Sequence, residues 1–313
     1  MNKSKVGTAI IILLAASVLL AAWGCGGSVN LTGMTARQLF NLGMEKYQAE
    51  RYLTAIEAFQ TVVYNYPGAA LIDSAQYYLA LSYYANKDYT LAGVEFNRLL
   101  LNYPSSVFAP QAQLMKAICY FEGTPDHYGL DQSDLQLAIE QFEDFLIDYP
   151  ESEAVDDCRA YLKEARTRLA QKHYTNGIVY VRVRDYRAAR VYFQKVIDEY
   201  TDTEFAPLAA FEMADTYYKS HDWDKAHEQF ENFKVVFSGH ELAGKAAERS
   251  CEALIKGGEE AADDGELEVA KTRLERFLTA CGHETENVEK VNELLREVEA
   301  ASLAGALGED AGS

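Results

Sequence analysis

The sequence predicts an all-α fold made of repeated antiparallel helix pairs, because three sets of residues recur in phase along the chain. Small residues recur in steps of 37, 37, 60, 37 and 37 residues, at Gly43, Ala80, Ala117, Gly177, Ala214 and Cys251. A second set places an alanine four residues before a large apolar residue, at Ala55/Phe59, Ala92/Phe96, Ala138/Phe142, Ala189/Phe193, Ala226/Phe230 and Ala270/Leu274. A third set closes each run, at Tyr66-Pro67, Tyr103-Pro104, Tyr149-Pro150, Tyr200-Thr201 and Phe237-Ser238.

Each period has the features of a helical hairpin. The small residue on the first helix allows the second helix to approach closely, and the Ala-x-x-x-Phe pair lies on one face of that second helix. Proline after tyrosine ends the helix, since proline has no N–H to donate. One hairpin cannot bury its apolar face alone, so neighbours must stack. These features resemble the tetratricopeptide (TPR) repeat, and they predict a TPR-like right-handed superhelical solenoid.

The same patterns place the expected helices. They are predicted near residues 34–49, 52–66, 69–85, 89–103, 107–121, 135–149, 153–168, 170–183, 186–200, 204–219, 223–237, 240–256, 267–281 and 285–300. Residues 122–134 are predicted to form a long loop inside the third hairpin. Residues 302–313 are small and acidic, and are predicted to be disordered.

The N-terminus has the composition of a secretory signal. Lys3 and Lys5 precede an uncharged run over residues 6–22, and small residues surround Cys25. The sequence Ala22-Trp23-Gly24-Cys25 resembles a bacterial lipobox, which implies a signal peptide over residues 1–24 and a lipidated Cys25. The alternative is an uncleaved membrane anchor, but 17 apolar residues are marginal for a span.

Four further cysteines, Cys119, Cys158, Cys251 and Cys281, are predicted to be buried and unpaired. In the expected hairpin of residues 240–256 and 267–281, Cys251 faces residue 272, and Cys281 lies about 13 Å away. That separation excludes a disulfide bond. No cysteine or histidine spacing is typical of a metal site.

Composition and motifs limit the functional classes. Removal of residues 1–24 takes away two of the 29 basic residues and leaves 48 acidic ones, a net charge of −21, which argues against nucleic acid as a partner. The chain has no phosphate-binding glycine loop, no G-x-S-x-G and no H-E-x-x-H. We therefore expect a binding protein with no cofactor and no enzymatic activity.

The order of these features resembles the BamD family, the TPR lipoproteins of the outer-membrane β-barrel assembly machinery. The matching stretches include residues 134–150, Tyr161 to Ala170, and Tyr186 to Tyr200, within a resemblance over about residues 25–238. The chain is thereby divided into a signal peptide (1–24), a lipidated linker (25–33), a BamD-like solenoid of five repeats (34–238), a further TPR-like extension (239–301) and a tail (302–313).

The resemblance implies a lipid-anchored protein on the periplasmic face of the outer membrane. Its C-terminal repeats would bind a POTRA domain of a BamA-like insertase, and its N-terminal repeats would bind unfolded outer-membrane β-barrel proteins. Two alternatives stay open: a Tol-Pal-associated TPR protein, and a TPR scaffold lipoprotein for another envelope machine such as pilus secretion. A generic enzyme is a third alternative.

Two candidate binding surfaces follow. The positions that line the concave face of TPRs are apolar or aromatic in the first three repeats, at Phe40, Met44, Tyr47, Tyr77, Leu81, Tyr84, Leu114, Ile118 and Phe121. They predict a groove for an extended peptide, unless they pack against the next repeat. A basic cluster at Arg182, Arg184, Arg187 and Arg190 predicts a docking site for an acidic partner, unless it is an ordinary solvated face.

Overall fold

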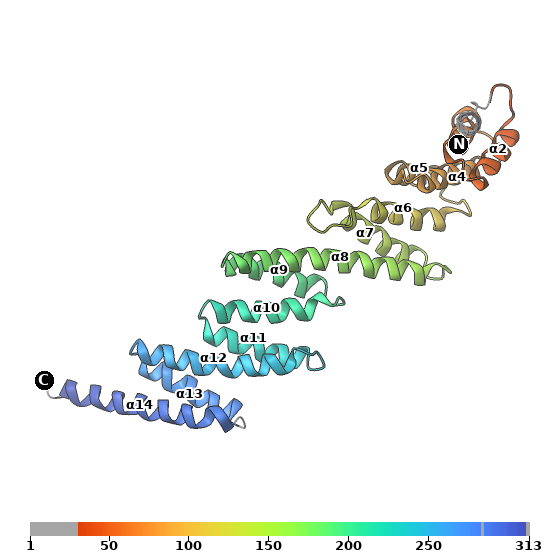
Figure 1. The fold of residues 1–313 in the computed structure, drawn as a ribbon. Helices are drawn as coiled ribbons and strands as arrows, with labels where there is room; N and C mark the ends of the chain where they lie inside the picture. Colours follow the sequence, from red (N-terminus) through yellow and green to blue (C-terminus); the bar gives the residue numbers. More distant parts are fainter. Residues whose placement is uncertain (1–30, 283–284, 311–313) are drawn as a thin grey trace, which may run out of the picture. The chain divides into compact units, whose positions relative to one another are not determined.

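The computed structural model describes residues 31–282 and 285–310, and within these ranges the chain forms thirteen helices and no strand (Figure 1). The predicted signal peptide and Cys25 lie outside the described residues. Two compact units divide the chain, one up to Cys119 and one from Tyr120 onward. Within the described residues, none of the helices is long and apolar enough to cross a membrane.

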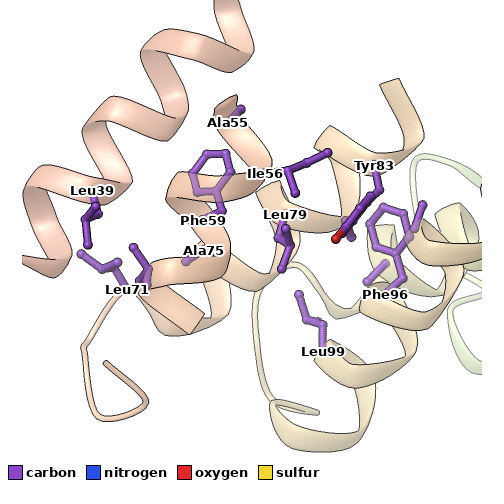
Figure 2. Close-up of a cluster of buried hydrophobic side chains, with 14 of the residues drawn as sticks. Leu39, Ala55, Ile56, Phe59, Leu71, Ala75, Leu79, Tyr83, Phe96 and Leu99 are labelled. Atoms are coloured by element: carbon purple, nitrogen blue, oxygen red, sulfur yellow. The ribbon is translucent and has the colours of Figure 1, made fainter. Parts of the chain in front are cut away.

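Unit 1 is made of two hairpins and most of a fifth helix: α2 (Ala36–Gln48), α3 (Tyr52–Asn65), α4 (Ile72–Ala85), α5 (Tyr89–Asn102) and α6 (Ala109–Gly123), which crosses into unit 2. Its core is continuous from one hairpin to the next. Figure 2 shows this core, from Leu39 of α2 through Phe59 of α3 to Leu79 of α4 and Phe96 of α5. All four side chains are fully buried.

Unit 2 continues the same arrangement. Its helices are α7 (Ser133–Asp148), α8 (Val155–Arg182), α9 (Tyr186–Glu199), α10 (Phe205–Lys219), α11 (Trp223–Val236), α12 (Ala243–Asp263), α13 (Leu267–Cys281) and α14 (Thr285–Asp310). Each helix packs against the next in sequence. The TPR-like, all-helical fold predicted from the sequence is confirmed.

The small residues act where the helices of a hairpin meet. A Cβ atom added to Gly43 would lie 2.6 Å from the Phe59 ring, and one added to Gly177 would lie 2.4 Å from the Phe193 ring. In both hairpins the small residue precedes its aromatic partner by 16 residues. The absence of a side chain is therefore what lets the buried ring reach the facing helix.

The hairpin turn has one conformation throughout. Seven residues after the small position, the backbone is left-handed at Glu50 (φ 58°), Lys87 (φ 66°), Arg184 (φ 62°) and His221 (φ 60°). The last hairpin has Gly265 (φ 76°) in this conformation, so its small residue is Gly258.

Gly258 corrects the predicted register of the last hairpin. The sequence pattern assigned the small position to Cys251, but a Cβ on Gly258 is the one that would meet Leu274, at 2.7 Å. The step from Ala214 is therefore 44 residues, the same as the step from Ala226 to Ala270. The seven added residues are close to two helical turns, which keeps the packed face in phase.

The corrected register explains a disulfide bond that the sequence argument excluded. Cys251 and Cys281 are bonded, with their Cα atoms 5.9 Å apart. Cys251 lies seven residues before Gly258 and Cys281 lies seven after Leu274, so the two face each other across the antiparallel pair. The prediction was wrong because α12 extends to Asp263, which moves the turn. Cys119 and Cys158 are free and buried, as predicted.

Two other expectations are corrected. Residues 153–168 and 170–183 form one helix, α8, because Leu169 and Ala170 at the expected break are buried and continue the helix. The tail predicted to be disordered from residue 302 is helical as far as Asp310, as part of α14.

Candidate partner-binding surfaces

The predicted groove residues of the first two repeats lie on α2 and α4 and are half-buried. Phe40 packs edge-on against Phe59 and Tyr78, with ring centroids 5.7 and 6.0 Å apart. Tyr77 stacks on Phe108 at 4.6 Å. These two rings therefore connect one repeat to the next, which is the packing alternative that the sequence left open.

The remaining four residues of these repeats leave more of their surface available. Met44 and Leu81 are partly buried against the unit 1 core. Tyr47 contacts the ring of Tyr52 at 5.8 Å, and burial raises the pKa of its hydroxyl. Tyr84 contacts the ring of Tyr89 at 5.4 Å, in the corresponding place of the second hairpin. An apolar ligand could contact this set without displacing a fully buried side chain.

The third predicted set is closed off. Leu114, Ile118 and Phe121 are only 8%, 6% and 6% exposed. The ring of Phe121 contacts that of Tyr161 at 5.5 Å, and the guanidinium of Arg168 lies 5.1 Å from its centroid. Arg168 in turn donates a hydrogen bond to the Pro125 carbonyl at 2.9 Å. Phe121 is therefore a packing residue, and the predicted groove doesn't extend to this set.

The arginine cluster divides into two parts. Arg190 packs its guanidinium 4.3 Å from the centroid of the Tyr217 ring and donates to Ser220 Oγ at 3.3 Å. Its role is therefore to connect α9 with α10. Arg182, Arg184 and Arg187 are exposed, and among the described residues no ion pair includes them.

These three arginines occupy the turn between α8 and α9. Arg184 is the left-handed residue of that turn, and exposed Val183 lies beside it at 67%. Three cations with no acidic neighbour in contact give a locally positive surface on a chain with a net charge of −19. Such a surface attracts an acidic partner most strongly at low salt.

One group of residues resembles a catalytic site without the geometry of one. Ser250 Oγ donates to Glu231 Oε1 at 2.6 Å and lies 2.9 Å from His227 Nδ1. Because the serine proton is directed to the glutamate, His227 cannot act as its base. Ser250 is fully buried, so the group connects α11 with α12. In the described part of the chain, no group of three or more His, Cys, Asp or Glu residues could hold a metal ion.

The sequence argument missed a set of exposed apolar residues in unit 1. Tyr64, Leu101 and Val107 are 57%, 72% and 79% exposed, at or just after the ends of α3 and α5. The signal was present in the sequence as two stretches without any charged residue, 58–72 and 99–115.

Comparisons with known proteins bear on these surfaces. The model of the YfiO family, described as outer membrane lipoproteins, matches residues 32–217. No curated protein matches the chain. Similar solved structures include the TPR2AB domain of yeast Sti1 in its pHSP90 complex, which is 14% identical with a TM-score of 0.37 and covers 84% of this chain and 98% of that one.

Two bacterial structures are similar to the same degree. The TPR protein BF2334 of Bacteroides fragilis is 15% identical, covers 85% of this chain and 98% of its own, and has a TM-score of 0.36. PilF of Pseudomonas aeruginosa is 16% identical, covers 82% and 97%, and has a TM-score of 0.28. At these values the structures carry no argument about partners.

Proposed function

Because this chain belongs to the YfiO family of outer membrane lipoproteins, we propose that it is a lipid-anchored TPR scaffold of β-barrel protein assembly. It would bind a POTRA domain of a BamA-like insertase and receive unfolded outer-membrane β-barrel proteins. The observation that carries this proposal is the family match over residues 32–217, which includes both the half-buried groove residues and the arginine turn.

The proposed anchor is Cys25, acylated after removal of residues 1–24 and held at the periplasmic face of the outer membrane. Several acyl chains on one cysteine would make the attachment stable, whereas one chain binds weakly. The Cys25→Ala variant should lose incorporation of a palmitate analogue and leave an unprocessed or soluble protein. Labelling and membrane retention equal to the wild type would contradict this part of the proposal.

The proposed docking site for the insertase is the exposed arginine turn. Charge reversal at Arg184→Glu with Arg187→Glu should slow association with the partner at low salt, because charges at an interface rim act mainly on the association rate. Arg37→Glu is a matched control, since Arg37 is also exposed but lies on α2 in unit 1. An association rate that the turn variant leaves equal to the control would exclude this site.

The proposed substrate surface is the half-buried set in unit 1. Replacement of Tyr47 and Tyr84 by alanine should weaken binding of a strand peptide that ends in an aromatic residue, with an unchanged melting temperature. A fully buried aromatic contributes about 1–3 kcal/mol, and these partly exposed ones less. Leu53→Ala, at an exposed site on α3, serves as the control. Early melting with normal binding would identify the two tyrosines as core residues.

The identity of the partner decides between this function and its alternative. Pull-down of the wild-type lipoprotein from detergent-solubilised membranes should recover a barrel insertase with POTRA domains. Recovery of Tol-Pal or pilus-secretion components in its place would support a scaffold for another envelope machine. The arginine variant in parallel tests whether the recovered partner uses the proposed site.

A further inference from the structure

The two hairpins of unit 1 have different chemistry at their two ends. One end carries the left-handed turns, and we name the other the open edge: the last turns of α3 and α5 and the loops that follow them, residues 63–72 and 100–108. Tyr64, Leu101 and Val107 of the open edge are exposed by 57%, 72% and 79%. Exposed apolar side chains are ordinary when scattered, so their grouping needs independent evidence.

Two contacts show that these segments lie side by side. Arg98 of α5 donates to the Tyr64 hydroxyl at 2.9 Å, and Ser106 donates to the Asp73 carboxylate at 2.8 Å. The two loops also line one shallow depression, between residues 69–73 and 102–106. The open edge is therefore one continuous surface.

The open edge is depleted of charge. Residues 58–72 and 99–115 contain no charged residue, in a chain in which 25% of residues are charged. Asp73 lies at the border of the edge and is hydrogen-bonded to Ser106. The result is an apolar and tyrosine-containing surface, a composition that suits the interface between lipid and water.

The opposite end of the same hairpins differs. Leu53 and Leu91 are exposed there too, but the turns beside them carry Glu50 with Arg51 and Lys87 with Asp88. Those charges favour contact with water. The contrast in charge lies within unit 1 itself and depends on no other part of the chain.

The N-terminal linker is attached to the open edge. The Tyr66 hydroxyl, at the end of α3, donates to the Met34 carbonyl at 2.8 Å, and Leu31 and Met34 pack against the unit 1 core. Cys25 lies six residues before Leu31. Six extended residues span at most about 21 Å, so an anchor at Cys25 holds this edge within that distance of the membrane.

We propose that the open edge of unit 1 rests on the surface of the lipid bilayer, with Tyr64, Leu101 and Val107 at the boundary between headgroups and acyl chains. The proposal rests on the anchoring at Cys25 proposed above. It assigns the edge a partner, a lipid surface, because a short tether and an uncharged apolar surface occur at the same end of the unit. The turn end, with its charges, then faces water.

The test supplies the anchor chemically, so that it does not depend on acylation in the cell. A chain that starts at Cys25 is coupled through that thiol to maleimide lipids, in vesicles containing brominated phosphatidylcholine. The other thiols are protected, since Cys119 and Cys158 are buried and Cys251 is bonded to Cys281. Leu101→Trp reports on the edge, and Val235→Trp is the control, because Val235 is 78% exposed near the end of α11.

Bromine should lower the emission of the tryptophan at position 101 at least about twofold relative to that at 235, after subtraction of buried Trp223. Adding Tyr64→Asp and Val107→Asp to the Leu101→Trp chain should remove most of this quenching, with an unchanged circular dichroism melt. Equal quenching at 101 and 235, or self-association of the coupled chain through this edge, would overturn the proposal. A chain that takes up no palmitate analogue in cells but shows the quenching would contradict the native anchor and leave the surface intact.

Discussion

The open ends of the hairpins differ between the two units, although the hairpins themselves are alike. In unit 1 the segments that follow α3 and α5 are uncharged. In unit 2 the corresponding segments carry Asp202 and Glu204 after α9, and Glu241 after α11. The last hairpin also replaces the aromatic residue at this place, Tyr66 in the first repeat, with disulfide-bonded Cys281.

This difference shows which parts of a TPR hairpin are free to vary. The small residue, its buried partner 16 residues later and the left-handed turn are fixed by packing. The open end makes few obligatory contacts, so its charge can be adapted to its surroundings. In unit 1 that adaptation favours a lipid surface, and in unit 2 it favours water and charged partners.

The largest expected effect concerns Phe121, which the sequence placed in a groove. Phe121→Ala should destabilise unit 2 by about 3–5 kcal/mol, as is typical when a buried phenylalanine is removed. Tyr84→Ala in unit 1 should cost much less, since Tyr84 is only half-buried. Urea unfolding followed by circular dichroism compares them, and equal small losses would restore Phe121 to the surface.

Removal of the disulfide bond should have the next largest effect. The bond closes a loop of 30 residues, so Cys251→Ala with Cys281→Ala should lower the stability of the last hairpin by about 2–4 kcal/mol. Hydrogen exchange read by mass spectrometry should show faster exchange in α12 and α13 and no change in unit 1. Exchange that stays as slow in α12 and α13 would show that packing alone holds the hairpin.

The small position should respond to a single methyl group. Gly177→Ala places a Cβ 2.4 Å from the fully buried Phe193 ring, and overpacking of this kind typically costs about 1–3 kcal/mol. That cost exceeds the gain of up to about 1 kcal/mol from helix propensity. Gly93→Ala on α5 is the control: its Cβ would meet only Cys119 Cβ at 3.6 Å, so stability should rise slightly. A rise in stability for Gly177→Ala would contradict the close-approach argument.

Mild acid should separate the units by a smaller amount. Burial, with Lys195 and Lys172 nearby, lowers the pKa of His173 from 6.5 to about 4. The unfolded chain therefore binds a proton more readily, and unit 2 loses stability as the pH falls from about 6.5 toward 4. All six histidines lie beyond residue 119, so unit 1 should not share this loss between pH 7 and 5.

Hydrogen exchange at pH 7 and 5, corrected for intrinsic rates, measures this difference. His173→Gln should reduce the pH dependence of α8 and α9. A pH dependence in α8 and α9 that the substitution leaves unchanged would assign the effect to other groups, such as His227, whose pKa burial also lowers.

The sequence predicted the fold well because packing repeats along the chain. Gly43 and Phe59 are adjacent in space for a reason that the sequence spacing expresses directly. The register of the last hairpin was missed because Cys251 is also small and stands at the expected period. The alanine pairs held the correct step, 44 residues from Ala226 to Ala270, and could have revealed it.

The candidate sites were less predictable, since exposure depends on contacts between distant segments. Phe121 is covered by Tyr161 and Arg168 of α8, about 40 residues away, and no local pattern contains that information. Arg190 is withdrawn from the cluster by Tyr217 in the same way. The open edge of unit 1, by contrast, follows from charge-free stretches that the sequence displays.

The left-handed turn has a consequence for how this chain can accumulate change. Glu50, Lys87, Arg184 and His221 each hold a side chain in a conformation that costs about 1–2 kcal/mol, and only Gly265 avoids it. Exchange of Glu50 or Lys87 for glycine would recover part of that energy without altering a buried contact. These positions are one repeat apart and therefore act independently. A damaging substitution in one repeat can thus be offset by a turn in another, which gives the solenoid several separate routes to tolerate mutation.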